Sequence, residues 1–415
     1  MTILKFIKTS YKLPDNLLVT SNLSEIFDEI KKFNGQVALV GGFVRSVILN
    51  EKINYRKISI DIATNLKPNQ IIKIFGSKAK YIDEGLKHGT VIVNNNGLIC
   101  EITTLRSDVL TKGRYADVEF VDHWFKDASR RDLTINAIYM DLEGNIFDPF
   151  NGSNDLVNGK IKFIGKMTDR LNEDFLRLLR FIRFFSKYSK NKIKKEQLDI
   201  LKKFSKKINF LSKERVIEEL KKIFSENKCI SLISAELMSK TNMDKNYFGF
   251  KFSLIKLEVL KNFNFNINWI KKILLLYYKE KNLDFIKNNP ISSDEKKLID
   301  NFNIKLTKEE ISNLLSDKWC STLYYLKGPV YLKLLIEVKF SLKIQNRINQ
   351  IKNFKKPMFP IKGEDILRLG LHEGPEVGLI LKKIEKKWVN SDFSSSRQEL
   401  LDELNICPNL ISVSK

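Results

Sequence analysis

The chain has 415 residues, 43% of them hydrophobic, and a formal net charge of +23. This length accommodates two to four domains with buried cores, and no apolar run approaches the ~20 residues that a membrane-spanning helix requires. The four cysteines and three histidines lie far apart, without the spacing of a zinc site or a disulfide framework. We also find no signal-peptide pattern at the N-terminus. These features argue against membrane, secreted and structural-zinc proteins and predict a cytoplasmic one.

The positive charge is concentrated after residue 150. Residues 1–150 hold 20 Lys and Arg against 18 Asp and Glu, whereas the remainder holds 52 against 31. A near-neutral first part followed by a strongly basic one is typical of a catalytic module joined to a polyanion-binding module. The alternative is compositional drift in a Lys-rich chain, but drift should not spare the first 150 residues.

In chain order, the first predicted element is an amphipathic helix over residues 22–33, in which Asn22 is the N-cap and Glu25 completes a capping box. An apolar, β-prone run at 37–40 then predicts a short buried strand, and Gly41 and Gly42 permit a tight turn.

A helix over residues 43–49 follows this turn, and its N-terminus can hold phosphate. Arg45 lies one turn into the helix, where it can contact phosphate with two N–H groups. Taken alone, the glycine turn is explained equally well by packing. The next apolar strand, residues 57–62, carries Asp61 in its middle.

A helix over residues 68–75 and three strands over residues 80–83, 90–93 and 97–104 complete the first sheet, with a hairpin turn before Gly97. The predicted fold class is α+β, a mixed sheet with helices on one side, followed by helical domains. Glu101 lies on a strand that could neighbour the strand of Asp61. Two adjacent carboxylates beside a phosphate-binding turn are suited to holding Mg²⁺ for phosphoryl transfer.

Residues 105–118 predict a mobile loop because they are polar and charged with both signs. Arg131 and Asp132 follow in the stretch SRRDLTINAIYMD. They either form a surface ion pair of little value or contact the phosphates and sugar of a nucleotide. A turn cluster at 147–156 marks the first domain boundary. We predict a catalytic head over residues 1–150, a helical neck over 151–215, a helical body over 216–354 and a helical tail over 355–415.

The motifs GGFVR, SIDIAT, CEITTLRSD, RRDLTINAIYMD, DPFNGSNDL and EDFLRLLRFIRF occur in an order that resembles the bacterial tRNA nucleotidyltransferase/poly(A) polymerase family. Within that family the chain is similar to the class II CCA-adding enzymes. The resemblance is dense over residues 36–186 and partly returns in the tail. It implies an enzyme that uses CTP, ATP and Mg²⁺ to add CMP and AMP to the 3′ end of tRNA without a nucleic-acid template.

The resemblance also implies roles for individual residues. It assigns binding of the incoming triphosphate to Gly41, Gly42 and Arg45, and two of three metal-binding carboxylates to Asp61 and Glu101. It assigns contacts with the nucleotide sugar and phosphates to Arg131 and Asp132. Base selection is assigned to Asp174 and Arg177. We expect Asp174 and Arg177 to share one face of a helix, since they are three residues apart. The basic helices and tail would bind the tRNA backbone and elbow.

Ser59 departs from this pattern, because it stands where the family has a metal-binding aspartate. Ser46 likewise replaces the aspartate that usually follows the arginine of GGFVR. Serine is neutral and a poor Mg²⁺ ligand. Three interpretations stay open: an active enzyme with two protein carboxylates, a catalytically silent RNA-binding relative, or a site in which another acid such as Glu51 supplies the missing ligand. Poly(A) polymerase and partial CCA addition are the alternatives among active enzymes, although the 105–118 loop favours full CCA addition by resemblance.

Overall fold

The computed structural model describes residues 4–14, 17–53, 59–81, 86, 88–108, 118–259, 267–277, 288–302, 306–327, 330–337, 341–370 and 372–406. By internal contacts the chain divides into two units. The first comprises Met1–Glu219 and Leu237–Gly249, and the second Leu220–Glu236 and Phe250–Lys415. The finer division into head, neck, body and tail stays a prediction.

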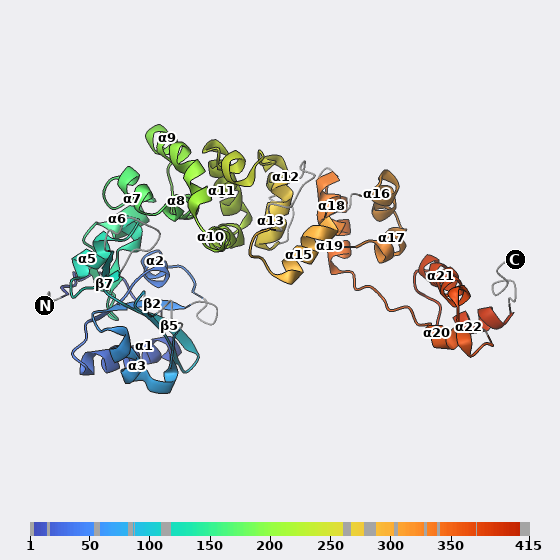
Figure 1. Ribbon diagram of the computed structural model, residues 1–415, viewed down its shortest axis with the longest axis horizontal. Helices are drawn as coiled ribbons and strands as arrows, with labels where there is room; N and C mark the ends of the chain where they lie inside the picture. The colour runs from blue at the N-terminus through green and yellow to red at the C-terminus, as the bar shows by residue number, and fades with distance from the viewer. Residues whose placement is uncertain are drawn as a thin grey trace. The chain divides into compact units, whose positions relative to one another are not determined.

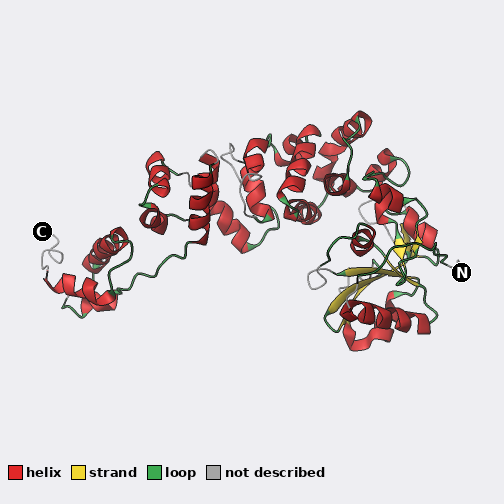
Figure 2. Ribbon diagram, turned by 180° about the vertical axis from the view of Figure 1, so that it is seen from behind, coloured by secondary structure: helices red, strands yellow, loops and turns green. Residues whose placement is uncertain are grey.

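A seven-stranded mixed sheet forms the centre of the first unit, and all strands of the described residues lie in this unit (Figure 2). The strand order is β3-β4-β5-β2-β1-β8-β9, and β2 and β5 are the only parallel neighbours within it. The strands are β1 (Val37–Leu39), β2 (Ile60–Thr64), β3 (Ala79–Lys80), β4 (Thr90–Asn95), β5 (Leu98–Thr104), β8 (Tyr139–Met140) and β9 (Ile146–Phe147). A separate two-stranded sheet pairs β6 (Arg106–Asp108) with β7 (Val118–Phe120).

The helices of the first unit follow the strands closely in sequence. They are α1 (Leu17–Lys32), α2 (Gly42–Ile48), α3 (Pro68–Phe75), α5 (Trp124–Ser129), α6 (Gly152–Val157), α7 (Met167–Glu173), α8 (Leu176–Tyr188) and α9 (Lys195–Phe204), with short 3₁₀ segments at Gly76–Lys78, Thr134–Asn136 and Ser205–Phe210. Two further helices, α10 (Lys213–Ser225) and α11 (Lys228–Lys240), have residues in both units, and a π-helical turn at Asp244–Phe248 belongs to the first.

The two faces of the sheet are covered differently. Figure 1 shows α1 and α3 on one side of β2 and β5, and α2 on the other. Strand alternation explains this division, because Ile60 and Ile62 are fully buried on one face while Ala63 packs on the other, in a second core that includes Trp124 and Tyr139. The prediction of helices on one side was therefore wrong in detail, although the mixed α+β fold is confirmed.

The first helix begins five residues before its predicted start. Asn22 does not cap it; instead the Asn22 carbonyl accepts from Nδ2 of Asn95, at 3.1 Å, and Glu25 accepts from the same amide at 2.9 Å. Both residues therefore attach α1 to the β4–β5 hairpin. That hairpin turns at Asn96 and Gly97, whose φ angles of 51° and 86° lie in the left-handed region that a tight two-residue turn needs.

The second unit is helical throughout its described residues. Its helices are α12 (Leu254–Val259), α13 (Trp269–Leu276), α15 (Ser293–Phe302), α16 (Lys308–Leu315), α17 (Trp319–Tyr325), α18 (Val330–Glu337), α19 (Leu342–Asn353), α20 (Gly363–Leu367), α21 (Pro375–Asn390) and α22 (Arg397–Ile406). No helix of the described ranges is long and apolar enough to cross a membrane.

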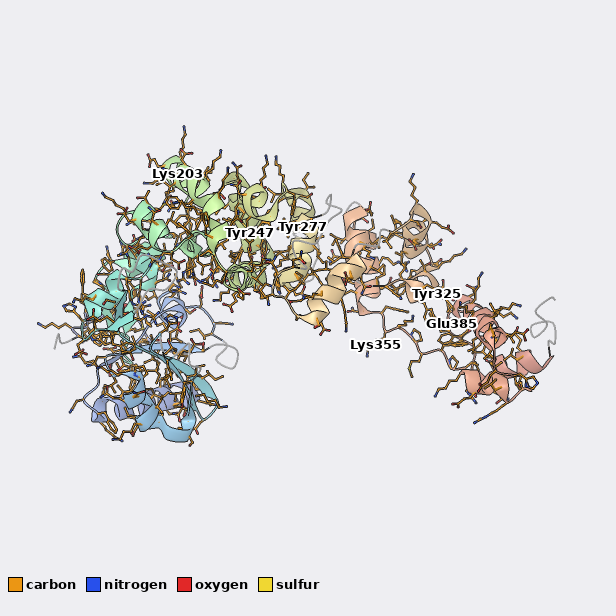
Figure 3. All side chains as sticks on the ribbon, in the orientation of Figure 1. Lys203, Tyr247, Tyr277, Tyr325, Lys355 and Glu385 are labelled. Atoms are coloured by element: carbon orange, nitrogen blue, oxygen red, sulfur yellow. The ribbon has the colours of Figure 1, made fainter. Side chains whose placement is uncertain are left out.

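An aromatic cluster joins α17 to the last three helices. The ring of Trp388 contacts those of Tyr324 and Phe393 with centroids 5.8 Å and 5.0 Å away. Tyr324 also donates to Glu385 at 2.8 Å, and Figure 3 shows Glu385 beside Tyr325 at this contact.

Candidate active site

The predicted carboxylate pair is formed by the parallel strands β2 and β5. Asp61 lies directly opposite Glu101 in the ladder, so both side chains project from the same face of the sheet. Ser59, two residues before Asp61, donates its hydroxyl to Oε1 of Glu101 at 2.6 Å. Two carboxylates and one hydroxyl therefore meet at this position.

The glycine turn closes over the Asp61 carboxylate. The backbone N–H of Gly42 donates to it, and Gly41 adopts a φ of 78° immediately before α2. A Cβ at Gly41 would lie 2.2 Å from Oδ2 of Asp61. Glycine is therefore required here both for its backbone conformation and for the close approach of the carboxylate.

Burial and the neighbouring Glu101 charge raise the pKa of Asp61 above its usual value. The Gly42 N–H and the positive charges of Arg131 and Arg45 oppose this effect without overcoming it. The protein thus holds a partly desolvated, like-charged pair, which a bound cation would relieve.

No third acidic side chain joins this pair in the part of the chain that the structure describes. Glu51, the acid considered as a substitute ligand, accepts instead from the Ser46 hydroxyl at 2.9 Å. The interpretation in which Glu51 completes the site therefore does not hold for the described residues. Residues 54–58, immediately before Ser59, lie outside the described residues.

Arg45 lies on α2, pointing away from water. It is 8% exposed, donates from Nη1 to the Asn136 side chain at 2.6 Å, and places its guanidinium 4.9 Å from the ring centre of Phe184 on α8. Its Nε has no hydrogen-bond partner among the described residues. An unsatisfied buried donor is costly, and an anion such as phosphate would satisfy it.

Asp132 is fixed by three donors in a buried position. Arg180 donates from Nε at 2.6 Å, Asn136 from Nδ2 at 2.8 Å and the Leu133 N–H at 2.9 Å. Burial by itself would raise the pKa of Asp132, but the Arg180 charge and these hydrogen bonds outweigh it and hold the pKa well below its usual range. Asn136 thereby connects Asp132 to Arg45.

Arg131 pairs with a residue that the sequence did not reveal. It donates from Nε and Nη2 to Asp127 at 3.2 Å and 3.1 Å, and Tyr139 donates its hydroxyl to the same oxygen at 2.5 Å. Asp127 is 1% exposed. Burial would raise its pKa, but Arg131 and Arg130 hold that pKa well below its usual range. The interpretation of Arg131 and Asp132 as a surface ion pair is therefore wrong.

The expectation that Asp174 and Arg177 share one helical face is also wrong. Helix α7 ends at Glu173, Asp174 is extended (φ −152°, ψ 112°), and α8 begins at Leu176. Arg177 is 9% exposed and donates to Glu173 and to the Arg130 carbonyl at 3.1 Å. This last contact brings Arg177 next to the Arg131–Asp132 segment.

Sequence reasoning missed the partners of these residues, namely Asn136 for Arg45, Asp127 for Arg131, Arg180 for Asp132, and Arg215, which donates to Asp174 at 2.7 Å. Only Asp127 left a local signal, because it precedes Arg130 and Arg131 by three and four residues in a helical segment. The prediction of a loop over residues 105–118 was wrong at both ends, because residues 106–108 form β6 and residue 118 begins β7, and the two strands pair with one another. Residues 109–117 lie outside the described residues.

Comparison with known proteins places this geometry in a family. Residues 37–162 match the "Poly A polymerase head domain". The human mitochondrial CCA tRNA nucleotidyltransferase 1 is 31% identical over 414 residues, covering 92% of this chain and 90% of that protein. This chain belongs to the CCA tRNA nucleotidyltransferase family.

Solved structures of CCA-adding enzymes share the fold. The Bacillus stearothermophilus CCA-adding enzyme in complex with CTP superposes with a TM-score of 0.69 at 22% identity, covering 93% of this chain and 96% of that one. The Thermotoga maritima CCA-adding enzyme complexed with tRNA superposes with a TM-score of 0.66 at 22% identity, covering 95% and 96%. These likenesses show that the chain shares the fold of the CCA-adding enzymes.

Proposed function

We propose that this chain adds CMP and AMP to the 3′ end of tRNA to complete the CCA sequence. The terminal 3′-hydroxyl oxygen of tRNA attacks the α-phosphorus of CTP or ATP, the bond to the β-phosphate breaks, and pyrophosphate leaves with release of the hydroxyl proton. The observation that carries this proposal is the Asp61–Glu101 pair held under the Gly41–Gly42 turn, in a chain whose family has this activity in its name.

Mg²⁺ fits the residues present at this pair. Its preferred ligands are carboxylate oxygens, water and substrate phosphates, and the raised pKa of Asp61 indicates uncompensated negative charge. Asp61 and Glu101 would hold the ion, which when bound would polarise the α-phosphate and the attacking hydroxyl. Ser59 would act indirectly, since its hydroxyl already orients Glu101.

The remaining assigned residues would bind and orient the nucleotide. Arg45 would offer its unsatisfied Nε to the triphosphate beside the Gly41–Gly42 turn. The side chains of Arg131 and Asp132 bind other protein side chains, so we propose that they position the surface that contacts the sugar and phosphates of the nucleotide.

Base selection is proposed for Asp174 and Arg177. The amino group of cytosine or adenine can donate to a carboxylate, and the adjacent ring nitrogen can accept from a guanidinium. Arg177 donates to the Arg130 carbonyl, so this base-selecting pair lies close to Arg131 and Asp132.

The basic residues after 150 would bind the tRNA backbone, with the neck over 151–215, the body over 216–354 and the tail over 355–415 as predicted. Recognition of this kind depends on shape and phosphate charge and weakens with salt. We also keep the cytoplasm as the proposed compartment. The described cysteines Cys100, Cys229 and Cys320 are free thiols.

The test is extension of a tRNA that lacks its CCA end, with labelled CTP and ATP and products resolved at single-nucleotide length. Addition of two C and one A supports the proposal. Indefinite A-tails on an unstructured RNA with ATP alone would indicate a poly(A) polymerase, and products that stop after CC would indicate partial addition. Salt-sensitive tRNA binding without any product would indicate a catalytically silent RNA-binding relative, the alternative suggested by Ser59 in place of a metal-binding aspartate.

A further inference from the structure

The buried ring of Phe184 brings three guanidinium groups together. Phe184 lies on α8 and is 3% exposed. The guanidinium carbons of Arg183, Arg45 and Arg180 lie 4.3 Å, 4.9 Å and 5.6 Å from the centre of its ring. The negative face of an aromatic ring attracts a cation within about 6 Å, and more strongly where water is excluded. One ring therefore holds an arginine of α2 together with two arginines of α8.

Two of these three arginines have a carboxylate of their own. Arg180 donates from Nε to Asp132 at 2.6 Å, and Arg183 donates from Nε to Glu219 at 2.5 Å. Arg45 instead donates to a neutral side-chain amide at 2.6 Å and makes no ion pair within the described residues. The group around the ring thus has three positive and two negative formal charges. Arg45 is the cation that is left for an anion from outside the protein.

The ring contact also holds Arg45 beside the glycine turn. A Cβ at Gly42 would lie 3.8 Å from Nη2 of Arg45, so the guanidinium is adjacent to the turn. Its Nη1 binds Asn136, and its Nε has no hydrogen-bond partner among the described residues. A free arginine side chain has several rotatable bonds, and ordering it when a ligand binds costs free energy. Contact with the ring orders this side chain before the ligand arrives.

We infer that Phe184 is a positioning residue, whose ring holds the guanidinium of Arg45 in place for the triphosphate of the incoming nucleotide. Phe184 itself touches no substrate and acts through Arg45. The same ring contacts Arg180, which fixes Asp132. Helix α8 therefore aligns the residue proposed for the phosphates with one proposed for the sugar. This inference rests on the proposed function, because it concerns the same nucleotide site.

The experiment replaces Phe184 with trifluorophenylalanine in the full chain. The fluorine atoms withdraw electrons from the face of the ring and weaken its attraction for a cation, while the ring keeps nearly the same shape. The matched control is the same replacement at Phe185, which is also buried on α8 and whose ring lies 5.6 Å from that of Phe181. Urea unfolding would verify that both proteins are folded under the assay conditions.

We expect the fluorinated Phe184 protein to bind CTP and inorganic tripolyphosphate about 3- to 30-fold more weakly, the range of one cation–π contact. The loss should appear mainly in KM, and tRNA affinity should be unchanged. In an Arg45→Gln background the same replacement should cause no further loss, because the cation is absent. Phe184→Leu, with Phe185→Leu as its control, repeats the comparison without a ring. Equal losses at both positions, or losses that add fully to those of Arg45→Gln, would overturn the inference.

Equilibrium binding of CTP and tripolyphosphate decides the inference even without turnover. A chain that adds no nucleotide, but binds both ligands and binds them more weakly once the ring of Phe184 is fluorinated, supports the role of Phe184 while refuting the proposed activity. An active chain in which this replacement leaves CTP affinity and KM unchanged refutes the inference alone. A chain with neither turnover nor triphosphate binding refutes both.

Discussion

Replacing Ser59 with aspartate should convert the two-carboxylate site into one with three acids. The change removes the hydroxyl that donates to Glu101 at 2.6 Å and places a third negative charge beside the pair. Two charges about 4 Å apart repel by about 1 kcal/mol in water and by about 4 kcal/mol at the effective dielectric of a protein surface. Ser59 is exposed, so the lower value applies, and loss of the hydrogen bond adds about 1 kcal/mol.

We therefore expect Ser59→Asp to be less stable than the unmodified chain by about 2 kcal/mol in EDTA, and to recover that loss when Mg²⁺ binds. A third anionic ligand should also lower the Mg²⁺ concentration that gives half-maximal CMP addition by about tenfold or more. Urea unfolding with and without Mg²⁺, together with Mg²⁺ titration of the first CMP addition, would measure both effects. Ser59→Ala is the control for loss of the hydroxyl alone.

The reasoning would be refuted by a Ser59→Asp variant with unchanged stability in EDTA and an unchanged Mg²⁺ requirement. Such a result would place residue 59 outside the range of the Asp61–Glu101 pair. A variant that gains Mg²⁺ affinity but loses activity would keep the metal site while showing that the ion is then held in an unproductive position.

Four further outcomes follow from the structure. Asp61→Asn should abolish nucleotide addition yet raise the free energy of unfolding in EDTA at pH 7. The pKa of Asp61 is raised in the folded state, so its ionisation destabilises the fold at pH values above its usual pKa; urea unfolding of both proteins measures this, and an equal or lower stability would contradict it. Gly41→Ala should lower kcat about 100-fold, because the added Cβ displaces Asp61. The control is Gly76→Ala, which should keep kcat: Gly76 also has a positive φ, but a Cβ there would have no atom within 4 Å. Equal losses in both variants would mean that backbone strain alone is responsible. Asp127→Asn should cost about 3 kcal/mol in unfolding free energy, because it leaves the partly buried Arg131 and Arg130 without their counter-charge. A loss below about 1 kcal/mol would show that Tyr139 and water suffice. Lys272 is fully buried, and burial lowers its pKa to about 8. Between pH 8 and 10.5 the unfolded state therefore binds more protons than the folded state, so the free energy of unfolding should rise across this window by roughly 3 kcal/mol relative to Lys272→Met. Parallel pH profiles of the two proteins would disprove this.

The elements that alternate regularly in the sequence were predictable. Asp61 lies between Ile60 and Ile62, and Glu101 between Cys100 and Ile102, and this apolar alternation was enough to place each on a strand. That the two strands could be neighbours was a possibility from sequence, which the structure confirms. The Gly41–Gly42 turn was predictable too, because glycine pairs mark tight turns. The packing reason for Gly41, namely the approach of the Asp61 carboxylate, could only be seen in three dimensions.

Partners far apart in the sequence were not predictable. Arg180 reaches Asp132 across 48 positions, and Arg215 reaches Asp174 across 41. Nothing in the local pattern of α8 or α10 distinguishes these arginines from others that face solvent. Asn22 illustrates the same limit, since its sequence context matches a helix cap while its actual contacts are with the hairpin residues Asn95 and Asn96.

The break between α7 and α8 was also hidden. Residues 173–184 read as one continuous helix, because Leu and Phe recur at helical spacing and neither glycine nor proline interrupts them. The chain departs from the helix at Asp174, whose carboxylate accepts from the Leu176 N–H as an N-cap side chain would. An aspartate inside an apolar helical pattern was the one available signal.

The central claim is that two protein carboxylates, Asp61 and Glu101, suffice for nucleotide addition by this chain. The most direct measurement is the rate of CMP addition to a tRNA lacking its CCA end, by the unmodified protein, over a range of Mg²⁺ concentrations. The account predicts addition that requires Mg²⁺, continues to the full CCA end when ATP is present, and disappears in Asp61→Asn. Normal tRNA binding without product at any Mg²⁺ concentration would contradict it.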